Sequence, residues 1–205
     1  MKISFCILIL TGWLSLQAQD YKLNQRYPGY FINIKGDTIR GYILLTNKIE
    51  NQRGAEFSND AKGEKIKIHL LPGQIRGFKV KDRMYSTVEY GEPDPTAEHF
   101  LMIREEGVLT LFEYFRLAKD LYVGEGAGQR PATGDDEQYL QSEYVITTRQ
   151  GKKFGIATPG ELIRNAEAIF KDDQQIITDI RNKEKGYRYN DLPELVKRYN
   201  ASHHP

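Results

Sequence analysis

The sequence contains almost no cysteine. Cys6 is the only one, and it lies within an apolar run at the N-terminus that we expect to be removed. A mature chain without cysteine forms no disulfide bond, and both thiol catalysis and cysteine ligation of a metal are excluded. Its stability must therefore come from a hydrophobic core, which a chain of this length can form as one domain.

The chain also lacks an excess of charge of either sign. It has 29 Lys and Arg against 28 Asp and Glu, and removal of Lys2 with the N-terminal run leaves 28 of each. A formally neutral protein has no overall field that attracts nucleic acid or anionic lipid. We therefore predict that nucleic acid is not a partner.

Long apolar runs are missing after the first residues. Lys2 precedes the apolar run 3–16, and Leu16-Gln17-Ala18 ends in a small residue suited to signal peptidase. This pattern predicts a signal peptide over residues 1–19, because the run is too short for a membrane-spanning helix. The mature chain is then expected in the periplasm or at the cell surface, with no stable transmembrane segment. An uncleaved N-terminal anchor is the alternative.

Catalytic motifs are absent as well. The sequence has no GxSxG, HExxH, GxGxxG or P-loop motif. Trp13, the only tryptophan, lies in the predicted signal peptide, so the mature chain relies on its 13 tyrosines for large amphipathic rings. Tyrosine-rich faces can bind glycans, but aromatic side chains also suit β-strands, and the absence of tryptophan favours the structural interpretation. No cofactor is expected.

What the sequence does contain is a series of β-hairpin patterns. The clearest runs from residue 30 to residue 45 (YFINIKGDTIRGYILL). A two-residue turn at Gly36-Asp37 pairs Ile34 with Ile39, with Gly36 supplying the positive φ that such turns need. Side chains alternate between the two faces of a strand. The predicted buried face of this hairpin consists of Tyr30, Ile32, Ile34, Ile39 and Ile43.

Similar patterns follow along the chain. The polar stretch 47–65 predicts a long connection with a short strand near Phe57. Together the patterns predict an antiparallel β domain over residues 20–158, in which the glycine-rich segment 124–138 forms a mobile loop. The other predicted strand segments are the single strand 66–71 and the hairpins 77–90, 100–115 and 144–157.

The hairpin over residues 100–115 combines this alternation with two apolar faces. A three-residue loop ending at Gly107 pairs Ile103 with Leu109. Strands that are apolar on both faces are typical of the covered interior of a sheet. We therefore expect this hairpin near the centre of the sheet.

At Thr158 the hydrophobic period changes from two to about three and a half. Thr158-Pro159-Gly160-Glu161 fits a capping box with proline at the first helical position. Residues 159–205 are therefore expected to form a helical C-terminal segment of about three short amphipathic helices. Such helices are not stable alone in water, so they must pack on the sheet as part of the same globular unit. The predicted inward-facing residues are Leu162, Ile163, Ala166, Ile169, Phe170, Ile176, Ile177, Ile180, Leu195, Val196 and Tyr199.

These patterns define an α+β fold class. We predict an antiparallel β-meander of roughly seven to nine strands, with the helical segment packed on it. The sheet is either open or a partly closed barrel. The hairpins share a design but little sequence identity, so they do not form a true repeat.

Loops on a rigid scaffold usually carry recognition, and two loops are rich in acidic residues. The turn before the hairpin 100–115 contains Glu92, Asp94 and His99, and the segment 124–138 contains Asp135 and Asp136. These side chains could bind a hard cation, but their spacing matches no known ligand motif. We interpret the five residues as contacts to a partner, and neither a metal site nor a catalytic site is predicted.

Two stretches resemble a known group of proteins. KGDTIRGYI at residues 35–43 is similar to a hairpin that follows the signal peptide in uncharacterised exported proteins of Bacteroidota, and DLPELVKRYN at residues 191–200 resembles the helical tail of the same group. The similarity covers about the first third of the mature chain and its last forty or so residues. It implies export. Because the group has no assigned activity, it implies no site residues.

The sequence therefore predicts a non-enzymatic exported envelope protein. Its β-rich scaffold is expected to bind an envelope protein, a glycan or an apolar ligand. The alternative is a periplasmic hydrolase whose acidic residues converge from separate loops, with Glu92, Asp94 and His99 as the candidates.

Overall fold

The structure, a computed structural model, describes residues 21–91, 94–117, 122–123, 130–131 and 140–203. Its strands are β1 (Gln25–Asn33), β2 (Thr38–Leu45), β3 (Ala55–Ser58), β4 (Lys67–Leu70), β5 (Ile75–Val80), β6 (Arg83–Glu89), β7 (Glu98–Glu105), β8 (Leu109–Leu117), β9 (Tyr122–Val123), β10 (Arg130–Pro131), β11 (Leu140–Thr148) and β12 (Lys153–Ile156). Ten of them form one open antiparallel sheet in the order β12-β11-β8-β7-β6-β5-β1-β2-β3-β4, and β9 pairs with β10 in a separate ladder. The predicted α+β class and antiparallel sheet are confirmed, with the sheet open.

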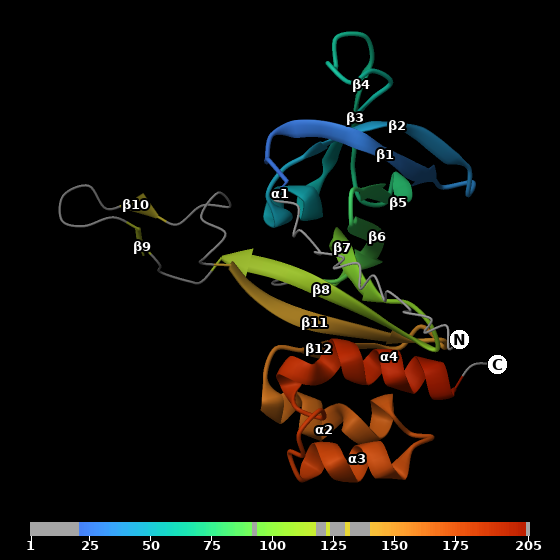
Figure 1. Cartoon of the computed structure of the whole chain (residues 1–205), viewed down its shortest axis with the longest axis vertical. Helices are drawn as coiled ribbons and strands as arrows, with labels where there is room; N and C mark the ends of the chain where they lie inside the picture. Colours follow the sequence, from blue (N-terminus) through green and yellow to red (C-terminus); the bar gives the residue numbers. More distant parts are fainter. Residues whose placement is uncertain (1–20, 92–93, 118–121, 124–129, 132–139, 204–205) are drawn as a thin grey trace, which may run out of the picture.

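The C-terminal helices cover one end of this sheet. They are α2 (Pro159–Ile169), α3 (Gln174–Arg181) and α4 (Leu192–Ser202), with the 3₁₀ helix η3 (Tyr189–Asp191) leading into α4. In Figure 1 they lie below β8, β11 and β12, whereas β1 to β4 lie at the opposite end of the molecule. The predicted inward-facing residues are buried, except that Ile163 is half-buried. The predicted packing of the helical segment on the sheet is therefore confirmed.

The core has two main parts, one at each end of the sheet. Side chains of β8, β11 and β12 pack with the three C-terminal helices in one cluster, and side chains of β1 to β7 pack in the other. Strand β8 contributes to both, because Leu109 and Leu111 contact the helical cluster and Phe115 contacts the N-terminal one. Strand β8 therefore connects the two clusters.

The turn predicted between β1 and β2 is wrong. Ile32 pairs with Thr38, which leaves a longer loop than two residues. The Asn33 carbonyl accepts from the Gly36 N–H at 3.0 Å, and the Asn33 side chain bonds both the N–H and the carboxylate of Asp37 at 2.9 Å. These side-chain bonds favour a three-residue loop in which Gly36, with φ 97°, takes the bulge position.

The altered register exchanges the faces of β1. Phe31 enters the core at 7% exposure, and Ile43 is fully buried as predicted. Ile32 is half-buried, whereas Ile34 is 62% exposed and Ile39 37% exposed. The predicted burial of Ile34 and Ile39 is therefore wrong. Ile34 lies in the loop between β1 and β2, and Ile39, although it pairs with the buried Phe31, lies next to the exposed loop at the start of β2.

The register predicted for β7 and β8 is also wrong. Ile103 pairs with Phe112 and not with Leu109, and a β-bulge separates Ile103 from Glu105. A bulge adds one residue to one strand and is not visible in the alternation of hydrophobic residues. The prediction that these strands lie inside the sheet is confirmed, since each has neighbours on both sides.

A short helix in the predicted connection 47–65 was missed. Helix α1 (Lys48–Arg53) begins at Asn47, whose side chain accepts from the Glu50 N–H at 2.9 Å. The strand expected near Phe57 is present as β3. Polar side chains hid α1 from sequence analysis, because its buried residues include Asn51 and Gln52.

Two buried amide side chains bind the backbone of β8 where its partner strands do not. Gln52 of α1 accepts from the Phe115 N–H at 2.7 Å and donates to the Phe115 carbonyl at 3.0 Å. Asn200 of α4 accepts from the Leu109 N–H and donates to the Leu109 carbonyl, both at 2.9 Å. Each amide therefore satisfies one donor and one acceptor that would otherwise be buried without a partner.

Candidate functional site

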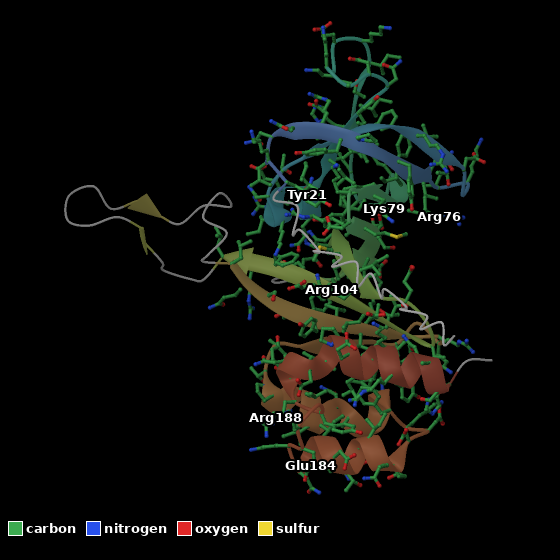
Figure 2. All side chains as sticks on the ribbon, viewed as in Figure 1. Tyr21, Arg76, Lys79, Arg104, Glu184 and Arg188 are labelled. Carbon is green, nitrogen blue, oxygen red and sulfur yellow. The ribbon has the colours of Figure 1, made fainter. Side chains whose placement is uncertain are left out.

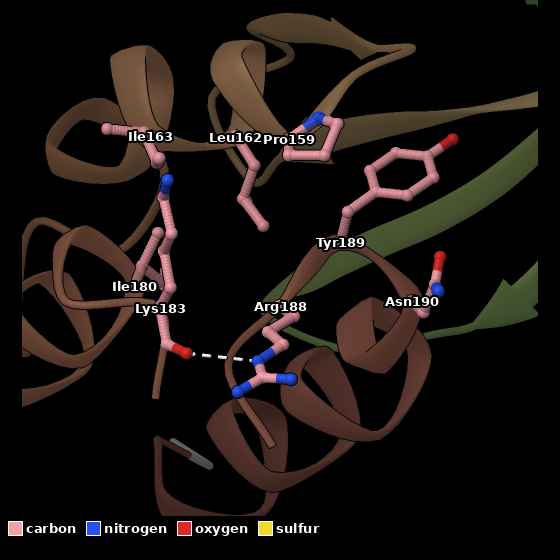
Figure 3. Close-up of a pocket in the computed structure, with 8 residues that line it drawn as sticks. All are labelled: Pro159, Leu162, Ile163, Ile180, Lys183, Arg188, Tyr189 and Asn190. Atoms are coloured by element: carbon pink, nitrogen blue, oxygen red, sulfur yellow. Dashed lines mark hydrogen bonds between the residues drawn. The ribbon is translucent and has the colours of Figure 1, made fainter. Parts of the chain in front are cut away.

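A cleft of about 490 Å³ opens in the helical end of the molecule, between α2, α3 and η3. Figure 3 shows its walls, and Figure 2 places Arg188 at the outer surface of this end. Its size is typical of sites for small ligands. The residues that line it are Pro159, Leu162, Ile163, Ile180, Lys183, Arg188, Tyr189 and Asn190.

The apolar wall of the cleft comes from the first turns of α2 and the last turn of α3. Leu162 and Ile180 are each 1% exposed and form its floor, while Ile163 is half-buried beside them. The capping box fixes where α2 begins: the Glu161 N–H donates to the Thr158 hydroxyl at 3.2 Å, and the Glu161 carboxylate accepts from the Thr158 N–H at 3.0 Å. The predicted capping box is confirmed, and it sets the apolar stripe against α3.

The cationic wall comes from the connection between α3 and η3. Lys183 lies two residues after the end of α3, in the left-handed region at φ 58°, a conformation that costs a non-glycine residue roughly 1 kcal/mol. Arg188 is held by its Nε, which donates to the Lys183 carbonyl at 3.0 Å. The Asp191 carboxylate accepts from the backbone N–H groups of Gly186 and Arg188 at 3.0 and 3.1 Å. The connection is therefore ordered by its own polar groups.

The charge of the cleft is of one sign. The exposed side chains of Lys183 and Arg188 stand at its mouth, and the described lining residues include no acidic side chain. Burial, followed by the nearby Tyr144, raises the pKa of Tyr189 to about 12. Tyr189 is thus neutral at physiological pH, and its ring packs against Tyr144 with 5.4 Å between the ring centres. An anionic group fits this mouth, and an apolar group fits the floor.

Two of the sequence-predicted contact residues, Asp94 and His99, are described, and neither lines the cleft. The Asp94 carboxylate accepts from the N–H and hydroxyl of Thr96 at 2.8 and 2.6 Å, and these bonds lower its pKa. His99 lies on β7 with its ring 5.6 Å from that of Tyr114, and burial, followed by the charge of Arg53, lowers its pKa. The Asp94 carboxylate therefore stabilises the turn in which it lies, and the His99 ring packs against Tyr114 of the sheet.

The remaining predicted contact residues are Glu92, Asp135 and Asp136, and all three lie outside the described residues. Within the described ranges no three His, Cys, Asp or Glu side chains are grouped so that they could hold a metal ion. Of the segment 124–138, only Arg130–Pro131 is described, and it pairs with Tyr122–Val123.

One buried carboxylate outside the cleft is committed to internal contacts. Glu143 on β11 is 6% exposed and accepts from the Tyr90 hydroxyl at 2.6 Å. Arg116 also lies 3.4 Å from its second oxygen. A carboxylate held by a phenol and a guanidinium in this way stabilises the fold, because both oxygens have partners.

Sequence reasoning identified the apolar residues of the cleft as a helical stripe but missed its two cations. Lys183 and Arg188 occur in the polar run KEKGYR, where a surface loop is the ordinary interpretation. The signal that could have found them is the following Asp191, which binds the loop backbone. The position of the loop over α2 depends on how the helices pack, and no local pattern specifies that.

Comparison of the chain with family models, curated proteins and solved structures finds no match. In the described part of the chain, no helix combines the length and the apolar character that crossing a membrane requires.

Proposed function

We propose that the protein is an exported, non-enzymatic envelope protein whose helical end binds an amphipathic anion. The ligand consists of an apolar chain and a carboxylate or phosphate head. The apolar chain of the ligand lies on Leu162 and Ile180, and its anionic head lies between Lys183 and Arg188. Carboxylate and phosphate heads share the chemistry that a lysine and an arginine recognise.

The observation that carries the proposal is the combination of an apolar floor with a mouth that has two cations and no acid among its described lining residues. Apolar burial contributes about 0.8 kcal/mol for each methylene removed from water. The two exposed cations contribute less, and they determine which head group is preferred. Affinity is thus expected to depend on chain length, and selectivity on charge.

The test is titration calorimetry with dodecanoate and dodecyl phosphate, kept below the concentration at which they form micelles. Dodecyltrimethylammonium has the same chain with a cationic head, and acetate has the head without the chain. Binding of the two dodecyl anions, with neither control bound, supports the proposal. Equal binding of the dodecyl cation contradicts it, because detergent-like adsorption to any apolar surface would produce that result.

Substitution of the cations assigns the binding to the cleft. Arg188→Ala and Lys183→Ala are each expected to weaken dodecanoate binding about two- to fivefold, as the loss of an exposed charged contact implies. Lys185→Ala is the matched control, because Lys185 is exposed in the same connection but does not line the cleft. A loss of affinity in the control equal to that in the two variants would show that the effect is not local.

Export is tested separately by expressing the full chain in a bacterium and determining the N-terminus of the product. A start at Gln19 or Asp20 in the periplasmic or surface fraction supports cleavage of a signal peptide. An intact product that retains Met1 would support the uncleaved anchor. The hydrolase alternative stays a prediction, and His99→Gln tests it if the purified protein cleaves a peptide or glycan library.

A further inference from the structure

Strand β4 forms one edge of the ten-stranded sheet and pairs only with β3 among the described strands. Figure 1 places it at the end of the molecule opposite the helices. The outer edge of such a strand presents backbone N–H and C=O groups that can pair with another extended chain. Because β4 lies at the end opposite the helices, a binding site on it is separate from the cleft and independent of the function proposed for the cleft.

Exposed large apolar side chains concentrate at this edge. Of the five in the described chain, Ile66, Ile68 and Leu71 fall within six consecutive residues, with exposures of 50%, 42% and 45%. The other two lie on the β1–β2 hairpin. Single exposed apolar residues are ordinary, but a group of them along the open edge of a sheet is typical of an interaction surface.

The charge along the edge is positive. Lys65 and Lys67 are exposed, and the nearest exposed acid in the same stretch is Glu64. Two other acids nearby are already engaged. Glu56 forms an ion pair with Arg26, and the Asp60 carboxylate accepts backbone N–H groups and a hydroxyl within its own loop.

The loop that leads into β4 is held in place by this carboxylate. Asp60 accepts from the N–H groups of Lys62, Glu64 and Lys65 at 3.0 to 3.2 Å and from the Ser58 hydroxyl at 3.1 Å. The hydrogen bonds, led by that from Lys65, lower the pKa of Asp60 to about 2. A partner strand therefore meets an edge that is already ordered, which lowers the entropic cost of binding.

A small cleft of about 300 Å³ adjoins the end of the strand. His69 and Leu71 line it from the β4 side, and Leu44 and Arg53 line it from β2 and α1. In recognition by strand addition, main-chain hydrogen bonds provide affinity, and pockets for side chains provide specificity. The remaining walls come from β2, β3 and α1 and include Glu50 and Glu56, so the cleft borders the face of the sheet on the β3 side of β4 and not its open edge.

We infer that β4 binds an extended segment of another protein in which acidic and apolar residues alternate. The acidic side chains lie against Lys65 and Lys67, and the apolar ones lie against the exposed isoleucines. A second copy of this chain is a poorer occupant, because antiparallel pairing of two β4 strands brings the lysines of both copies to one seam. Lysine on an edge strand thus opposes self-association and favours an acidic partner.

The test uses a capped peptide of alternating glutamate and valine, about eight residues long, the length of an ordinary strand. Calorimetry is expected to show binding that weakens as salt rises. A peptide of alternating lysine and valine is expected not to bind. Equal binding of the two peptides would overturn the inference, as would a concentration-dependent dimer of the protein that excludes the acidic peptide.

Two versions of the acidic peptide, N-methylated on alternate residues, test for strand pairing. In an antiparallel pair only every second residue bonds to a given neighbour, so one version is expected to bind and the other to lose binding. Equal binding of both versions would show that the peptide binds without backbone hydrogen bonds to β4, and this would overturn the inference.

Substitution locates the contact. Lys67→Glu is expected to weaken binding of the acidic peptide about five- to tenfold and to confer binding of the basic one. Lys171→Glu makes the same charge change at the opposite end of the molecule and is expected to leave binding unchanged. Lys67 and Lys171 are both exposed, so both variants are expected to unfold at the same denaturant concentration as the wild type. Equal loss of binding in the two variants would overturn the inference.

Discussion

Replacement of Gln52 by leucine removes a contact that ties the N-terminal half of the sheet to β8. Leucine has a similar volume, so the change removes two hydrogen bonds without opening a large cavity. Gln52 and Phe115 are each 3% exposed, so water cannot replace the lost amide. The Phe115 N–H and carbonyl, bonded to Gln52 at 2.7 and 3.0 Å, are left without partners.

The expected cost follows from those two groups. A buried polar group without a partner costs about 1 to 3 kcal/mol, and the buried leucine regains part of this through its apolar surface. We expect a net loss of about 2 to 4 kcal/mol. Natural domains have free energies of unfolding of about 5 to 15 kcal/mol, so this loss is a large fraction of the total stability. Asn200→Leu removes the equivalent pair of bonds to Leu109 and is expected to cost a similar amount.

Urea denaturation followed by circular dichroism measures both losses. Gln175→Leu is the control, because Gln175 is exposed on α3 and its side chain bonds only to Asp179 among the described residues. The control is expected to change the free energy of unfolding by less than about 0.5 kcal/mol. A loss below about 1 kcal/mol for Gln52→Leu would refute the reasoning, because the backbone of Phe115 would then have found another partner.

Three further substitutions test the helical end and the sheet. Lys183→Gly relieves a left-handed residue and is expected to raise the free energy of unfolding by up to about 1 kcal/mol while weakening dodecanoate binding; equal affinity would remove Lys183 from the site. Thr158→Ala removes the cap of α2 and is expected to cost about 1 kcal/mol in urea denaturation, whereas no loss would show that the cap is dispensable. Burial and Arg53 lower the pKa of His99 below its ordinary value of 6.5. Its contribution to stability is therefore full above pH 6.5 and is lost as the pH falls through the lower folded pKa, so His99→Gln is expected to flatten this part of the curve of stability against pH.

The helical end shows how far local patterns reach. Thr158, Glu161 and the apolar stripe of α2 lie within a few turns of one another, so capping chemistry and helical periodicity specify them without tertiary contacts. The same holds for the existence of most strands, because alternation reports that one face of a segment is buried. The strand order of the sheet follows largely from its hairpins, since consecutive strands usually pair.

The registers of the β1–β2 and β7–β8 hairpins depend on contacts that the alternation of apolar and polar residues does not reveal. In β1, Tyr30 and Ile32 offer one apolar face and Phe31 offers the other. The hydrogen bonds between Asn33 and Asp37 select the loop that buries Phe31. A bulge has the same effect between β7 and β8. One misplaced residue exchanges two faces, so register is the step at which sequence reasoning is weakest.

By itself, the sequence determined the α+β class, the strand-rich first part and the capped amphipathic helices, because each depends on residues close together in the chain. Only the tertiary structure decided the registers, the contacts of Gln52 and Asn200 with β8, and the cleft that joins Leu162 to Lys183 and Arg188. These features pair groups from separate elements, and their energies are set by burial and geometry that exist only once the sheet and helices have packed.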